Sequence, residues 1–169
     1  MKTQQHIELW QKIATFKLDD PIAEFPFSKK LAQENKWTED FALRVIAEYK
    51  KFVFLCATLP DGASPSPIVD EAWHLHLTYT QNYWNDFCPN ILGFQLHHHP
   101  SKGGKNEAQK HNDWYRTTLE NYIHIFEEIP PTDIWNYPLN FNPAAYLPDD
   151  SPLLLPNIDK NEEIGRAHV

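Results

Sequence analysis

The segment VDEAWHLHLTYTQNYW, residues 69–84, places two histidines and an aspartate among aromatic side chains. Asp70 and His74 are four residues apart, so on a helix they share one face and lie one turn from each other. A carboxylate in that position can hold the imidazole by a hydrogen bond or bind a metal ion together with it. The same face carries Gln81 and Asn85, which is also compatible with an ordinary solvated helix surface.

His76, the second histidine of the HLH triplet, faces elsewhere. At about 100° per residue, His74 and His76 diverge by about 160° on a regular helix. His76 then falls in an apolar stripe with Trp73 and Tyr83, where a histidine is most often a core residue satisfied by a hydrogen bond. We expect His76 to point into the core and to bond to Thr80 or to a backbone carbonyl, which leaves it only an alternate metal ligand.

A second group of histidines lies in LHHHP, residues 96–100. The proline biases His99 toward an extended conformation, in which His97 and His99 point to one side and His98 points to the other. A histidine on a stiff loop can complete a site that begins on a helix. Two imidazoles and one carboxylate form the facial arrangement that binds Zn²⁺ or Fe(II) with positions left open for water and substrate. The alternative is a polar loop with no special chemistry.

Hydrophobic spacing predicts the helices that would position these groups, because apolar residues recur at helical intervals in five segments. The expected helices cover residues 3–16, residues 27–36 with Ser28 as N-cap, residues 38–58 with Thr38 as N-cap, residues 67–87 with Ser66 as N-cap, and residues 106–128. Residues 38–58 and 67–87 should be the two longest central helices. No segment alternates long enough to form a sheet, so the predicted fold is an all-α bundle of about four to five helices.

Two of these helices carry specific expectations about side-chain direction. In residues 38–58, a polar stripe is formed by Asp40, Arg44, Glu48 and Lys51. In residues 106–128, the side chains expected to face the core are Trp114, Leu119, Tyr122 and Phe126.

From Pro130 onward the sequence is proline-rich and aperiodic, yet too aromatic for a solvated linker. We expect residues 130–163 to be irregular and to pack over a helical part formed by residues 1–129 of the same domain, with Trp135 buried. The last six residues, IGRAHV, resemble a translated sequencing adapter, so residues 164–169 are excluded from the fold. The natural chain is therefore expected to continue beyond Glu163.

Charge and composition narrow the classes of function. A formal net charge of −8 argues against a nucleic-acid-binding surface. No apolar run approaches the roughly 20 residues of a membrane span, and the N-terminus lacks the apolar centre of a signal peptide. Cys56 and Cys88 lie in apolar helical patterns and are expected to be reduced and buried. We expect a cytoplasmic protein whose visible segment binds neither nucleic acid nor a membrane.

The stretch SPIVDEAWHLHLTYTQNYWNDFC, residues 66–88, followed by GFQLHHHP, residues 93–100, resembles the glycine-rich domain-containing protein-like family of plants and bacteria. The likeness extends over most of residues 37–135. The family's D-x-x-W-H motif, its later tyrosine and cysteine, and its H-x-P histidine fall on Asp70, Trp73, His74, Tyr83, Cys88 and His98. The glycine-rich region is missing here, as a truncation would produce. The resemblance implies no particular activity.

Two functions from different classes are compatible with these residues. The first is a metal-binding domain with Asp70, His74 and His98 as ligands and His97 as the replacement candidate, open to hydrolytic or oxidative chemistry. The second is a noncatalytic module for a protein partner, in which the same residues form a structural hydrogen-bond network and the aromatic C-terminal segment supplies the binding surface. No Ser-His-Asp order, glycine-rich phosphate loop or C-x-x-C pair indicates a third route.

Overall fold

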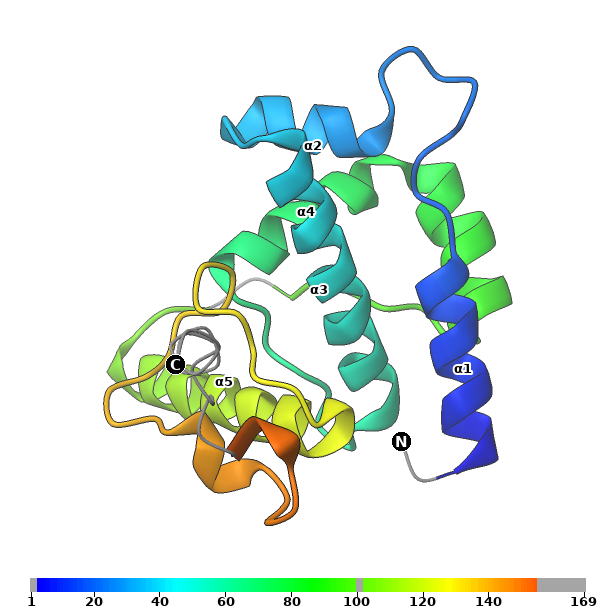
Figure 1. The fold of residues 1–169 in the computed structure, drawn as a ribbon. Coiled ribbons are helices and arrows are strands. Elements are labelled where there is room, and N and C mark those ends of the chain that lie inside the picture. The colour runs from blue at the N-terminus through cyan, green and yellow to red at the C-terminus, as the bar shows by residue number, and fades with distance from the viewer. Residues whose placement is uncertain (1–2, 100–101, 155–169) are drawn as a thin grey trace, which may run out of the picture.

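The computed structural model describes residues 3–99 and 102–154, and within these ranges all regular structure is helical (Figure 1). The five α-helices are α1 (Gln4–Thr15), α2 (Phe27–Asn35), α3 (Glu39–Thr58), α4 (Pro67–Thr78) and α5 (Lys105–Phe126). A sixth helix, η1 (Gln81–Leu92), is of the π type, and two short 3₁₀ turns follow α5, η2 (Pro143–Tyr146) and η3 (Pro152–Leu154). The predicted all-α fold is confirmed.

Helix α3 is the central element, since it contacts α1, α2, α4 and α5. In Figure 1, α1 and η1 lie side by side, and α5 lies beside the end of α3 with the C-terminal segment over it. The core side of α3 carries an apolar stripe at helical spacing, including Ala42, Val45, Tyr49, Phe52 and Val53, each at most 1 % exposed. The stripe makes α3 the scaffold against which the other helices are placed.

Two of the predicted N-caps are confirmed and one is wrong. Thr38 and Ser66 accept hydrogen bonds from backbone N–H groups three residues later, both at 3.1 Å. Ser28 does not cap α2, because that helix already begins at Phe27. Instead, the Ser28 backbone N–H and hydroxyl both donate to the Asp19 carboxylate, at 2.7 and 2.6 Å. A carboxylate from the preceding loop thus satisfies the first turn of α2.

The predicted helix over residues 67–87 is wrong as a single element, because α4 ends at Thr78. The Thr78 hydroxyl donates to the Leu75 carbonyl at 2.7 Å, and Tyr79 leaves the helical region with φ −83° and ψ 67°. Threonine in such a position competes with the backbone for its own helix, which favours an end there. The prediction that residues 67–87 form one of the two longest helices is therefore wrong. The two longest helices are α5, with 22 residues, and α3, with 20.

Helix η1 begins after this break and contains Pro89 in its interior. Proline has no backbone N–H to donate and its ring crowds the preceding turn of an α-helix. A wider π turn accommodates both effects, and Gly93 closes it by donating to the Cys88 carbonyl five residues earlier at 2.8 Å. The break and the wide turn together give η1 its own direction, which brings it against α1.

The segment after α5 is irregular and packed, as predicted, over its described part, residues 130–154. Trp135 is fully buried, and its ring lies 5.8 Å from that of Tyr122 and 6.3 Å from that of Tyr115. The Trp135 indole N–H and the Tyr122 hydroxyl both donate to Glu48, at 3.0 and 2.8 Å. Glu48 belongs to the predicted polar stripe of α3, yet it is only 7 % exposed. Its hydrogen bonds compensate for burial of the carboxylate.

Only some of the α5 side chains that were predicted to face the core do so. Leu119 and Tyr122 are fully buried and Phe126 is half-buried, but Trp114 is 40 % exposed. The prediction for Trp114 is therefore wrong. Trp114 instead lines a cavity together with residues before α4.

Both cysteines are free thiols; Cys88 is buried as predicted, but Cys56 is only half-buried, so the predicted burial is wrong for Cys56. Burial raises the pKa of Cys56 to about 12, as expected of an unreactive thiol. In residues 3–99 and 102–154, no helix combines the length and apolarity that a bilayer crossing requires. The predicted adapter tail, residues 164–169, lies outside the described part of the chain.

Candidate metal centre

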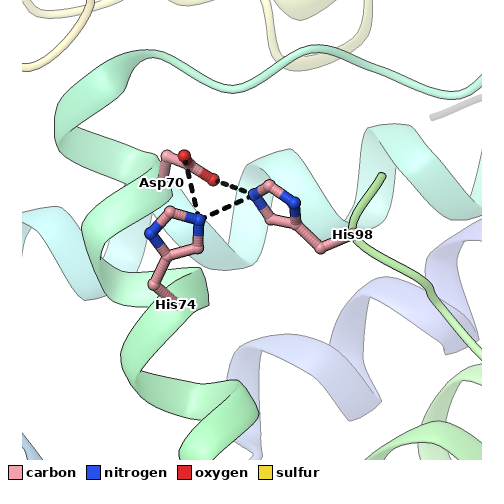
Figure 2. Close-up of side chains that lie close together, drawn as sticks. All are labelled: Asp70, His74 and His98. Carbon is pink, nitrogen blue, oxygen red and sulfur yellow. Dashed lines mark hydrogen bonds and ion pairs between the residues drawn. The ribbon is translucent and has the colours of Figure 1, made fainter. Parts of the chain in front are cut away.

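Three polar side chains meet beside the N-terminal half of α4 (Figure 2). Asp70 lies in the first turn of α4 and His74 one turn later, while His98 comes from the irregular segment after η1. His98 Nε2 lies 2.8 Å from Asp70 Oδ1 and 2.9 Å from His74 Nε2, and His74 Nε2 lies 3.3 Å from Asp70 Oδ2. The predicted convergence of these three residues is thus present in the structure.

The centre is open on one side. The His74 side chain is 52 % exposed, whereas those of Asp70 and His98 are 25 and 23 % exposed. Both histidines turn Nε2 toward the carboxylate, and their Nδ1 atoms point away from it (Figure 2). Three donor atoms therefore face a common point that solvent can reach.

A chain of hydrogen bonds fixes the segment that carries His98. The Trp73 indole N–H donates to the Tyr83 hydroxyl at 2.9 Å, and this hydroxyl donates to the Leu96 carbonyl at 2.5 Å. Burial raises the pKa of Tyr83, which keeps the hydroxyl protonated as a donor. The sequence indicated Trp73 and Tyr83, because motif residues of the family that it resembles fall on them. It gave no signal for the Leu96 carbonyl, because a backbone acceptor has no residue-type signature.

Trp73 also supports the His98 ring directly. The two ring centroids are 4.5 Å apart, and the other side of Trp73 packs on Phe52 of α3 at 5.1 Å. Trp73 is only 6 % exposed. Trp73, a residue of the core, therefore supports the ring of His98, a candidate metal ligand.

His76 does not join this centre. Its ring is fully buried, Nδ1 accepts from the Tyr49 hydroxyl at 2.7 Å, and Nε2–H donates to Asn82 Oδ1 at 2.7 Å. Burial raises the pKa of Tyr49 and lowers that of His76 to about 4, so the imidazole stays neutral. The predicted core position is confirmed, but the predicted partners, Thr80 or a backbone carbonyl, are wrong. The break after α4 brings Asn82 to the ring in their place.

His97, the replacement candidate, also lies apart from the centre. Its exposed ring packs on Trp84 at 5.2 Å, and His99 lies on the same side, 6.2 Å from His97. This is the alternation expected of an extended segment, with only His98 directed toward Asp70.

The fold and these residues define a class: an all-α domain with an Asp-His-His cluster close enough to hold one metal ion. The family model described as UCP032817-like matches residues 12–142, and the chain belongs to that family. The match carries no link to glycine-rich domain-containing proteins, so that resemblance stays a prediction. Neither the comparison with curated proteins nor the comparison with solved structures found a match.

Proposed function

We propose that the protein is a metal-binding domain in which Asp70, His74 and His98 hold one divalent ion, Zn²⁺ or Fe(II). The observation that carries the proposal is a conflict among their three contacts. An imidazole nitrogen carries either one hydrogen or one lone pair. With Asp70 ionised, its two contacts are favourable only if both histidines have a hydrogen on Nε2. The contact between the two Nε2 atoms, at 2.9 Å, is favourable only if one of them lacks it.

While Asp70 is ionised, no distribution of protons on the two imidazoles satisfies all three contacts at once, whereas a cation does. Each atom can then direct a lone pair at the ion. With metal–ligand bonds of about 2.0–2.2 Å, neighbouring ligand atoms lie about 3.0 Å apart at a right angle and about 3.4 Å apart at a tetrahedral angle. The observed separations of 2.8, 2.9 and 3.3 Å fall close to this range.

Three protein ligands leave positions for water and substrate, as in catalytic rather than structural metal sites. When bound, the ion would lower the pKa of its water toward neutrality or, as Fe(II), support oxidative chemistry. The exposure of His74 keeps one side of the centre reachable. The residues of this chain would fix the ligands: Trp73 supports the His98 ring, and Tyr83 holds the backbone beside it.

The alternative is a structural network in a protein-interaction module. The proton conflict described above counts against this alternative, because hydrogen bonds alone leave one of the three contacts unfavourable. Its proposed binding surface is also largely used within the protein, since Trp135 and Phe141 of the C-terminal segment are at most 8 % exposed. Leu139, at 88 % exposed, is the main apolar side chain there that faces solvent.

The test is a metal titration of protein first stripped with a chelator, followed by calorimetry and elemental analysis. We expect one ion per chain, with Fe(II) titrated under anaerobic conditions. Asp70→Asn, His74→Ala and His98→Ala should each weaken binding about a hundredfold or more. His97→Ala is the matched control, because this exposed neighbouring histidine should leave affinity unchanged.

Folding must be followed in the same variants. His74 is half exposed, so His74→Ala should change the free energy of unfolding by no more than about 0.5 kcal/mol. Wild-type protein that takes up no metal, together with a His74→Ala variant that unfolds, would favour the structural network instead.

Two finer assignments belong to the same proposal. The motif residues of the glycine-rich domain-containing protein-like family, including Asp70, Trp73, His74, Tyr83 and His98, gather at one centre, which supports a relation to that family. The free thiols of Cys56 and Cys88 support a cytoplasmic location. Fractionation of cells that produce the natural protein tests the location directly.

A further inference from the structure

A cavity of about 920 Å³ opens beside the candidate metal centre, and Asp70 and His98 form part of its wall. The N-terminal half of α5 forms another part of the wall, which includes Lys110, His111 and Trp114. This volume lies in the range of about 300–1,000 Å³ typical of small-molecule sites. A ligand in the cavity would therefore reach both the ion and α5.

The walls of the cavity are held in place by hydrogen bonds between elements. The buried Ser64 hydroxyl and His111 Nε2 are 3.2 Å apart, and the Ser64 backbone N–H donates to Thr118 at 2.9 Å. Tyr115 donates to the Asn136 carbonyl at 2.8 Å, which ties α5 to the C-terminal segment. The cavity is thus shaped by three separate parts of the chain.

The charge of the cavity depends on the ion. Its charged lining residues are three carboxylates and two lysines, namely Asp61, Asp70, Glu107, Lys102 and Lys110. With its histidines neutral, the lining carries one net negative charge. A divalent ion at Asp70 reverses this to one net positive charge, so the loaded cavity attracts anions and the empty one does not.

The apolar part of the lining is aromatic. Trp114 is 40 % exposed, and Trp73 and Tyr115 line the same cavity. The Trp114 ring meets His111 edge to face at 6.4 Å, which leaves its indole in the cavity wall. Trp73 and Tyr115 are buried, so the exposed indole of Trp114 is the ring among these three that offers a stacking surface for a planar ligand.

We infer that this cavity binds a small aromatic anion, with its acidic group toward the metal ion and its ring against Trp114. The inference rests on the metal-binding function proposed above. It adds the class of ligand: a planar ring bearing a carboxylate or a similar group.

The experiment is an NMR titration of zinc-loaded, ¹⁵N-labelled protein with benzoate. Cyclohexanecarboxylate, which has the charge but no planar ring, and benzamide, which has the ring but no charge, are the comparison ligands. The indole N–H signal of Trp114, assigned by its loss in Trp114→Ala, reports binding in the cavity. We expect benzoate to shift it and to bind about tenfold or more tightly than either comparison ligand.

Variants separate the ring contact from the metal. Trp114→Ala should weaken benzoate binding about fivefold or more, read from backbone signals of the cavity wall. Phe25→Ala is the matched control, because this aromatic residue is 50 % exposed and lies outside the cavity. Removal of zinc should weaken binding about tenfold or more.

Different experimental results would overturn this inference and the metal-binding proposal. Protein that binds zinc but shows no shift of the Trp114 signal, or binds cyclohexanecarboxylate equally well, keeps its metal site and overturns the inference. Equal benzoate binding with and without zinc overturns it too. A chain that takes up neither Zn²⁺ nor Fe(II) contradicts the proposed function itself.

Discussion

His74 and His76 are two residues apart on α4, yet they lie in opposite environments. His76 is fully buried, and each ring nitrogen has one partner of the complementary kind, a hydroxyl donor and an amide acceptor. His74 is half exposed, and its Nε2 shares a carboxylate and a second imidazole. One histidine is in a closed network, and the other is in an open one.

The difference indicates how a structural histidine can be told from a candidate ligand. A closed network matches every hydrogen with one lone pair, so an added ion would only displace a satisfied bond. At the open cluster the proton conflict leaves lone pairs that a cation can use. The exposure of the two histidines supports the same distinction. An ion can reach the half-exposed His74 from solvent, whereas His76 is buried.

Trp73 lies between the two environments, and its removal should have the largest effect. Trp73→Ala deletes a 6 %-exposed side chain that packs on Phe52 and supports His98. We expect the free energy of unfolding to fall by about 3–5 kcal/mol, measured by denaturant titration. A loss below about 1 kcal/mol would mean that this contact with the core contributes little.

The pH dependence of stability should come next and should report His76. Its pKa is about 4 in the folded protein, against an ordinary value of 6.5, so the unfolded chain binds the proton first. Stability is then fully present above about pH 6.5 and decreases as the pH falls toward 4, by about 3 kcal/mol in total. Denaturant titrations across this window measure the slope.

The variant His76→Gln provides the control for this slope. Glutamine does not titrate, so the part of the slope between pH 6.5 and 4 that His76 causes should disappear, whatever the absolute stability of the variant. An unchanged slope would assign the acid sensitivity to other groups and weaken the contrast between the two histidines.

The smallest effect is expected from Tyr83→Phe, which keeps the ring and removes the hydroxyl between Trp73 and Leu96. We expect a loss of about 1 kcal/mol in stability. Metal affinity should fall about tenfold, because the segment that carries His98 is no longer held in place. Calorimetry and denaturant titration measure the two effects.

Tyr79→Phe is the matched control for that substitution. The Tyr79 ring packs on Phe27 at 5.4 Å, and it lies outside the candidate centre. Equal metal affinity in the two phenylalanine variants would show that the Tyr83 hydroxyl does not position His98.

Local sequence rules predicted several elements well and failed where distant parts of the chain meet. Thr38 and Ser66 were recognised as caps because a cap acts on its own next turn. Glu48 was predicted to lie on a polar stripe, and its own helix gave no sign that Trp135, 87 residues later, donates a hydrogen bond to it. Trp114 was predicted to face the core because its spacing is helical, but it lines a cavity and is 40 % exposed.

The sequence by itself determined the helical class, the shared face of Asp70 and His74, and the opposite direction of His76. These features follow from the 3.6-residue period of the α-helix, which depends only on the local sequence. Only the tertiary structure decided that His98, 28 residues from Asp70, reaches the carboxylate. That contact requires the break at Tyr79, the turn of η1 and the Tyr83 hydroxyl at Leu96, and their combined geometry depends on packing against α1 and α3, which no local period encodes.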